Sequence, residues 1–137
     1  MENEEKKNAN EATSKELAQA ICLALSAKKA KDIATVYVRE KSSLCDYFVI
    51  ASGTSSTQVR AMGEYVEEQM EKQFSLSPVR EEGMRDGRWS VLDYGDVIVH
   101  IMQDETRLFY HLERIWGDGE KFVDEEEQSA SEEKKSE

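Results

Sequence analysis

A chain of 137 residues with 39% hydrophobic content is long enough for one globular domain and too short for two independent cores. Its 29 acidic and 18 basic residues leave a net charge of −11, which argues against general affinity for nucleic-acid backbones and predicts little direct RNA contact. No apolar run approaches the roughly 18 residues of a membrane span, and the N-terminus lacks a signal-peptide pattern, so we expect a protein of the bacterial cytoplasm.

The acidic excess lies mainly at the two ends of the chain. Residues 1–13 carry a net charge of −2 and residues 124–137 carry −5, which leaves −4 for residues 14–123. Both ends are too polar to bury the apolar surface that would offset the entropy of ordering them. The sequence therefore predicts a folded domain at 14–123, between a disordered N-terminal tail at 1–13 and a disordered acidic C-terminal tail at 124–137.

The predicted elements begin with a helix that opens at Thr13 and ends near Lys29. Thr13 and Glu16 have the spacing of a capping box, and the apolar residues after them recur at helical intervals. Residues 32–39 alternate β-branched side chains, which is typical of a strand. The next run, 47–51, is continuously apolar, which indicates a central strand covered on both faces.

A long helix is expected next, because Ser55 and Gln58 form a second capping box. The apolar residues after them keep helical spacing as far as Phe74. Residues 78–82 then form a short edge strand in this interpretation, since Pro78 has no N–H to donate to a neighbouring strand.

For the last part of the domain, the sequence predicts a hairpin and a closing helix. Residues 88–94 and 97–102 are strand-like runs, and the Gly95-Asp96 pair joins them by a tight turn. Residues 105–116 place their apolar side chains on one helical face. The resulting order, α-β-β-α-β-β-β-α, predicts a single α/β domain with a mixed sheet of about five strands and helices packed on it.

Residues able to carry chemistry are present, but they do not form a convincing constellation. Cys22 and Cys45 lie in apolar runs and are interpreted as buried, reduced thiols rather than metal ligands. His100 and His111 have no second ligand at a suitable spacing. We therefore predict no catalytic residue, no metal site and no cofactor.

One enzymatic alternative stays open: a metal-dependent nucleotide-binding or nucleotidyltransferase-like protein. Asp93 and Asp96 span the hairpin turn and could bind a metal, although aspartates in turns usually bond their own backbone. The loop at Gly53, between a strand and a helix, could hold a phosphate on backbone N–H groups. It has one glycine and lacks the lysine of a P-loop, so the signal is weak.

The hairpin also has the residue types of a protein-binding surface. Alternation places Trp89, Val91 and Asp93 on one face, with Leu92 and Tyr94 on the other. If one face is exposed, a patch of Trp, Tyr and Met side chains rimmed by carboxylates has the composition of a binding hot spot. Equally, the helices of the domain could cover both faces.

Several of these segments closely resemble the Iojap, or ribosomal silencing factor (RsfS), family. They are residues 46–59 (DYFVIASGTSSTQV), the Glu82-Gly83 pair, residues 87–102 (GRWSVLDYGDVIVHIM) and residues 107–116 (RLFYHLERIW). The resemblance runs in order over residues 14–123. It implies a fold similar to nucleotidyltransferases, without their metal-binding aspartate pair and without catalytic activity.

The resemblance further implies a partner, the large ribosomal subunit, contacted mainly through its fourteenth protein. Binding there would sterically block association with the small subunit and repress translation under nutrient limitation. The interface residues that it suggests combine apolar anchors with carboxylates: Trp89, Leu92, Asp93, Tyr94, Asp96, Met102 and Glu105. A homodimer formed through the same hairpin is a further alternative.

Overall fold

The computed structural model describes residues 13–39, 45–110 and 120–121. The predicted tails lie outside these ranges apart from Thr13, and so do residues 111–116 of the closing helix. The described elements, in order, are α2 (Thr13–Ala27), β1 (Lys31–Tyr37), β2 (Tyr47–Gly53), α3 (Ser56–Phe74), β3 (Arg80–Glu82), β4 (Trp89–Asp93), β5 (Val97–Gln103), α4 (Asp104–Tyr110) and β6 (Glu120–Lys121). No described helix is long and apolar enough to cross a membrane.

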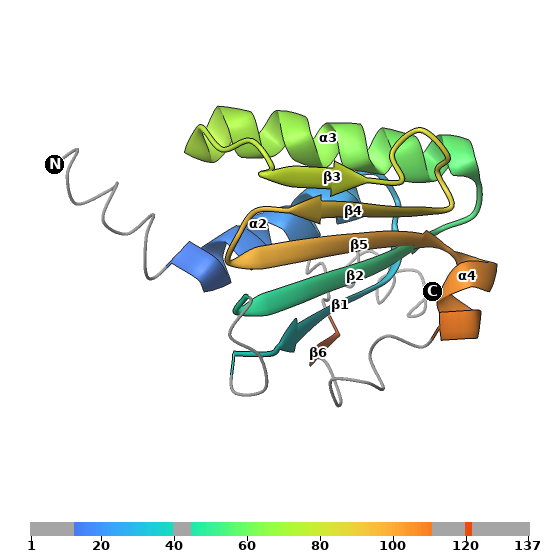
Figure 1. Cartoon of the computed structure of the whole chain (residues 1–137), viewed down its shortest axis with the longest axis horizontal. Helices are drawn as coiled ribbons and strands as arrows, with labels where there is room; N and C mark the ends of the chain where they lie inside the picture. The colour runs from blue at the N-terminus through green and yellow to red at the C-terminus, as the bar shows by residue number, and fades with distance from the viewer. Residues whose placement is uncertain (1–12, 40–44, 111–119, 122–137) are drawn as a thin grey trace, which may run out of the picture.

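The strands form one mixed sheet in the order β3-β4-β5-β2-β1-β6 (Figure 1). The central strands β2 and β5 are parallel neighbours, whereas the remaining pairs are antiparallel. The expected single α/β domain with a mixed sheet is confirmed, and the two-residue β6 adds a sixth strand beside β1.

The main core lies between α2, α3 and one face of the sheet (Figure 1). Alternate residues of β5 point into it, and α3 contributes the apolar positions that its helical spacing predicted. Each fully buried large aliphatic side chain stabilises the fold by about 1.5–3 kcal/mol relative to an exposed one. The core therefore fixes which face of each central strand is turned towards the helices.

The opposite face of the sheet carries a second, smaller apolar cluster. Its buried members come from β1, β2 and β5 and from the residues after β1 and before β2: Val36, Val38, Cys45, Ile50 and Met102. Phe48, Trp89 and Ile98 pack against them and stay partly exposed. We call these eight residues the second-face cluster. Its presence explains why residues 47–51 are continuously apolar, since β2 contributes to both faces.

The start of α3 follows its capping signal with one difference. Ser55 Oγ accepts a hydrogen bond from the Gln58 N–H at 3.1 Å, as a capping box requires. The Gln58 side chain instead accepts from the Thr54 N–H and hydroxyl at 2.7 and 2.9 Å, and it donates to the Lys29 carbonyl at 3.4 Å. Gln58 thus ties the start of α3 to the residues after α2.

Candidate functional site

Three of the seven predicted interface residues are buried. Leu92 is fully buried on the helix-covered face, where Tyr94 keeps only 8% of its surface exposed. Met102 is fully buried in the second-face cluster. The expected exposed patch of Trp, Tyr and Met side chains is therefore wrong for Tyr94 and Met102, because alternation defines two faces and does not tell which one other elements cover.

The other four residues lie at the two ends of the hairpin. Trp89 pairs with Met102 and is half-buried, near the exposed Glu105 at the start of α4. Asp93 pairs with Ile98 and lies next to the turn that contains the exposed Asp96. Four residue steps along β4 separate Trp89 from Asp93 by about 13 Å, so this set spans the hairpin rather than forming one point of contact.

His100 and Phe48 join Trp89 on the second face, and sequence reasoning did not include them in the site. Trp89 Nε1–H donates a hydrogen bond to His100 Nδ1 at 3.0 Å. The rings of Phe48 and His100 meet edge to face, with their centroids 5.0 Å apart. Alternation along β5 was the available signal, since it places Ile98, His100 and Met102 on one side of that strand.

Electrostatics keep His100 neutral in this setting. Burial lowers the pKa of His100 from 6.5 to about 4. Its Nε2 atom is buried and has no hydrogen-bond partner among the described residues. A neutral imidazole that accepts at Nδ1 must carry its proton on Nε2, so the Trp89 hydrogen bond also fixes the tautomer.

Three carboxylates gather at the turn end of the hairpin. The Asp46 and Tyr47 N–H groups both donate to the Asp96 carbonyl, at 2.8 and 3.1 Å, which joins the turn to the start of β2. Burial, and then the negative charges of Asp93, Asp46 and Asp96, raise the pKa of the Cys45 thiol to about 11. The second face therefore has an acidic end beside its apolar cluster.

The buried-thiol interpretation of the cysteines is confirmed. Cys22 and Cys45 are both free and buried. Burial raises the pKa of Cys22 to about 12, so its reactive thiolate is scarce near neutral pH. In the described parts of the chain, no group of three or more His, Cys, Asp or Glu side chains is placed to hold a metal ion.

The geometry does not assemble the nucleotide site considered above. In the parallel β2–β5 pair, Gly53 lies beside Gln103 at one end, whereas the Asp93–Asp96 turn precedes Val97 at the other. Six residue steps along a strand separate the two ends by about 20 Å. Moreover, Asp93 Oδ1 accepts from the Gly95 N–H at 2.8 Å, which is the turn role of such an aspartate.

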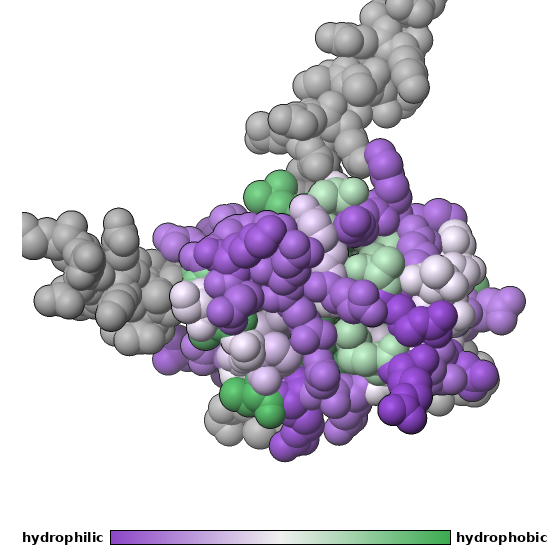
Figure 2. Space-filling view, turned by 90° about the horizontal axis from the view of Figure 1, so that it is seen from above, coloured by the Kyte–Doolittle hydropathy of each residue, from purple (hydrophilic) through white to green (hydrophobic). Residues whose placement is uncertain are grey.

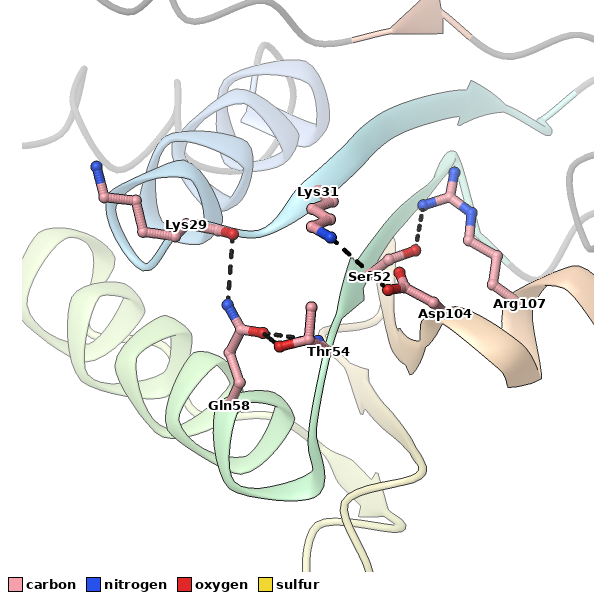
Figure 3. A network of polar contacts seen from close by, with 7 residues as sticks. All are labelled: Lys29, Lys31, Ser52, Thr54, Gln58, Asp104 and Arg107. Carbon is pink, nitrogen blue, oxygen red and sulfur yellow. Dashed lines mark hydrogen bonds and ion pairs between the residues drawn. The ribbon is translucent and has the colours of Figure 1, made fainter.

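The carboxyl ends of β2 and β5 are instead occupied by a polar network of the protein itself (Figure 3). Arg107 of α4 donates to the Ser52 hydroxyl at 3.0 Å and to the Asp32 carbonyl at 2.5 Å. Lys31 lies 3.9 Å from the Asp104 carboxylate. Parallel strands often bind ligands at this edge, but here the side chains shown join α4 to β1 and β2.

The comparisons with known proteins agree with the fold and the hairpin motifs. Residues 11–137 match the family model described as "Ribosomal silencing factor during starvation". The chain belongs to the ribosomal silencing factor family. A relative from Zymomonas mobilis, named "Ribosomal silencing factor RsfS", is 43% identical over 103 residues, which cover 75% of this chain and 74% of the relative.

Two further members of the family extend this comparison. The chloroplastic protein Iojap of Zea mays is 36% identical, over 74% of this chain and 44% of that protein. A crystal structure of a Chromobacterium violaceum protein has a TM-score of 0.72 and 29% identity, covering 80% of this chain and 92% of the other. The family resemblance inferred from residues 46–59 and 87–102 is therefore confirmed.

Proposed function

We propose that this protein is a ribosomal silencing factor that binds the large ribosomal subunit, mainly through its fourteenth protein, and prevents the small subunit from joining. The observation that carries the proposal is family membership together with a partly exposed aromatic and aliphatic surface on the second face. The protein then acts in the bacterial cytoplasm and lowers translation when nutrients are limiting. It requires no catalytic step.

The composition of the second face supports a basic protein partner. Phe48, Trp89 and Ile98 offer apolar contact area, and aromatic side chains dominate the energetics of many interfaces. Asp93 and Asp96 add negative charge at the end of the same hairpin. A ribosomal protein rich in Lys and Arg would complement this charge, whereas the net charge of −11 opposes close approach to bare RNA.

Leu92, Tyr94 and Met102 enter the proposal as supporting residues. Their side chains are buried, so they can hold the hairpin in shape while their neighbours contact the partner. Glu105 is exposed at the opposite end of the hairpin from the acidic turn and provides a second charged contact in this arrangement. The interface would thus run along the hairpin from α4 to the turn.

A steric mechanism is sufficient for inhibition. A body of about 110 residues has a radius of gyration of about 13 Å. A particle of that size, bound on the surface that meets the small subunit, occupies space that the joined ribosome needs. The affinity for the large subunit then determines how strongly joining is reduced.

Sedimentation of purified ribosomal subunits through a sucrose gradient tests this proposal. The full chain should co-migrate with the large subunit and reduce the fraction of joined particles. Trp89→Ala should abolish both effects, whereas Leu23→Ala should not, since Leu23 is an apolar residue of α2 that is 55% exposed away from the hairpin. A parent protein that stays at the top of the gradient would refute the proposal.

Self-association through the same face would compete with ribosome binding. Light scattering over a range of protein concentrations distinguishes a monomer from a homodimer. If a dimer forms, Trp89→Ala should dissociate it, and the parent protein should silence less effectively per chain at high concentration. A dimer that survives Trp89→Ala must use another surface.

A further inference from the structure

The histidine of the second face lies between two aromatic residues from the adjacent strands. His100 on β5 accepts the Trp89 hydrogen bond from β4 and contacts the Phe48 ring of β2. The Trp89 and His100 ring centroids are 6.0 Å apart, with the planes inclined by 49°. The three side chains therefore form a row across three neighbouring strands, and two of its members also belong to the partly exposed edge of the second-face cluster.

The hydrogen bond satisfies the only polar group of the Trp89 side chain. An indole has one N–H donor and no acceptor, and buried tryptophan usually needs a partner for that donor. Because His100 supplies the acceptor from within the protein, an apolar surface can cover the remaining indole ring without leaving the N–H unpaired. The partner needs to provide no acceptor at this position.

The hydrogen bond between Trp89 and His100 leaves the other ring nitrogen of His100 buried and unpaired among the described residues, which costs free energy. His100 places a buried Nε2–H where no acceptor lies among the described residues. An aliphatic residue of similar size would avoid that penalty but would leave the Trp89 N–H without its acceptor. The cost is consistent with a role for His100 in orienting the indole rather than in packing alone.

We propose that His100 is a positioning residue that holds the Trp89 indole in its docking orientation, so that Trp89 meets an apolar pocket on the ribosomal protein as a purely hydrophobic anchor. The inference rests on the proposed function. It adds the residue that orients the anchor and the chemistry of the surface that receives it. Phe48 supports the imidazole from the β2 side and limits its rotation.

Two substitutions separate the acceptor from the bulk of the side chain. His100→Leu retains apolar volume and removes the acceptor, whereas His100→Asn keeps an oxygen at the position of Nδ1 and can restore the hydrogen bond. We expect His100→Leu to weaken binding to large subunits by about tenfold, equivalent to ~1.4 kcal/mol. His100→Asn should stay within about threefold of the parent, which corresponds to under ~1 kcal/mol.

The indole resonance reports orientation independently of binding. In a Trp116→Phe background, Trp89 supplies the single remaining indole N–H signal of the chain. Its proton shift should move towards that of an unbonded indole in His100→Leu and stay near the parent position in His100→Asn. A change in packing alone would not follow this order between the two variants.

A double-mutant cycle with Trp89→Phe guards against loss of folding in His100→Leu. Trp89→Phe removes the N–H donor. In that background His100→Leu and His100→Asn should therefore bind large subunits equally well, because neither can form the hydrogen bond. The inference fails if His100→Leu shifts the indole signal yet binds within threefold of the parent, or if Leu and Asn weaken binding equally. Trp89→Ala that binds like the parent would instead refute the proposed interface itself, so the two failures can be distinguished.

Discussion

Glu67 on α3 faces Glu81 on β3 at the edge of the sheet. Burial, followed by a hydrogen bond with Glu81 and the charges of Glu81 and Glu64, raises the pKa of Glu67 from 4.5 to about 7. The Tyr94 hydroxyl is buried without a partner among the described residues, and burial followed by the charges of Glu67 and Glu81 raises its pKa. At neutral pH the two facing carboxylates therefore oppose each other in the folded state.

The raised pKa of Glu67 predicts a pH-dependent loss of stability. Its contribution is fully present below the unfolded pKa of 4.5 and is lost as the pH rises through about 7. Glu67→Gln removes the ionisation and keeps a donor for Glu81, so the variant should gain stability over the parent at pH 8. Urea unfolding of variant and parent at pH 5 and pH 8 measures this gain. If the difference in unfolding free energy between the two proteins is the same at both pH values, the prediction is wrong.

Glu68→Gln is the matched control for Glu67→Gln. Glu68 is the next residue on α3, where it forms an exposed pair with Lys72 at 3.0 Å. Loss of such a pair costs about 0.3–0.5 kcal/mol.

His100 contributes to the pH dependence of stability with the opposite sign, since its depressed pKa provides stability above pH 6.5 that is lost as the pH falls through about 4. The contribution of Glu67 is therefore obtained from the difference in unfolding free energy between Glu67→Gln and the parent at each pH, in which the contribution of His100 cancels.

At the scale of the elements, the β4–β5 hairpin separates residues that hold the fold from residues available for contact. Leu92 is fully buried against the helices, so Leu92→Ala should cost about 2–5 kcal/mol of unfolding free energy. The folded fraction should still bind large subunits with the parent affinity. Trp89→Ala loses packing against the second-face cluster and so also costs stability, but its folded fraction should fail to bind. Denaturation and binding measured on the same preparations test both variants.

The turns that join β3 to β4 and β4 to β5 differ in how much space they leave. Gly83 has φ +72°, and a Cβ there would lie 2.0 Å from the Trp89 carbonyl oxygen, whereas Gly95 has φ +90° and open space around it. Gly95→Ala should cost about 1–2 kcal/mol for the left-handed backbone alone. Gly83→Ala should cost about 2–5 kcal/mol, since the backbone must also move. Thermal unfolding of the two variants checks the order.

Sequence patterns predicted the elements better than they predicted the surface. The continuous apolar run at 47–51 identified β2 as a central strand, and the Gly95-Asp96 pair located the hairpin turn. Alternation also sorted Trp89 and Leu92 onto opposite faces of β4. It could not show that Met102 would be buried on the second face, because burial there depends on residues distant in sequence, including Val36 and Ile50.

At the scale of the whole molecule, the parallel β2–β5 pair determines which residues can act together. Because β2 and β5 run parallel with Tyr47 beside Val97 and Gly53 beside Gln103, Gly53 and the Asp93–Asp96 turn lie at opposite ends of the same strand pair. Local motifs gave no information on this separation, which arises from the register of strands 50 residues apart. The same register brings Asp46 beside Asp96 and creates the acidic end of the second face.

The surface on the α3 side contrasts with this second face. Seen from above, that side is mainly hydrophilic, and its hydrophobic residues are scattered (Figure 2). Charges on α3 therefore offer controls for charges on the hairpin. Glu68→Gln and Asp96→Asn each remove one exposed carboxylate, so the two variants carry the same net charge as each other, one unit less negative than the parent's −11.

Association with a basic partner should depend on salt through the acidic end of the hairpin. Raising the salt concentration from 50 to 500 mM shortens the screening length from about 14 to about 4 Å, so long-range attraction largely disappears. We expect the association rate with large subunits to fall by about tenfold or more and the dissociation rate to change little. Asp96→Asn should reduce both the association rate at low salt and its salt dependence, whereas Glu68→Gln should alter neither. Stopped-flow mixing with fluorescently labelled subunits measures these association rates. If the two variants lower the rate equally, the long-range attraction comes from the overall charge of the chain rather than from the hairpin.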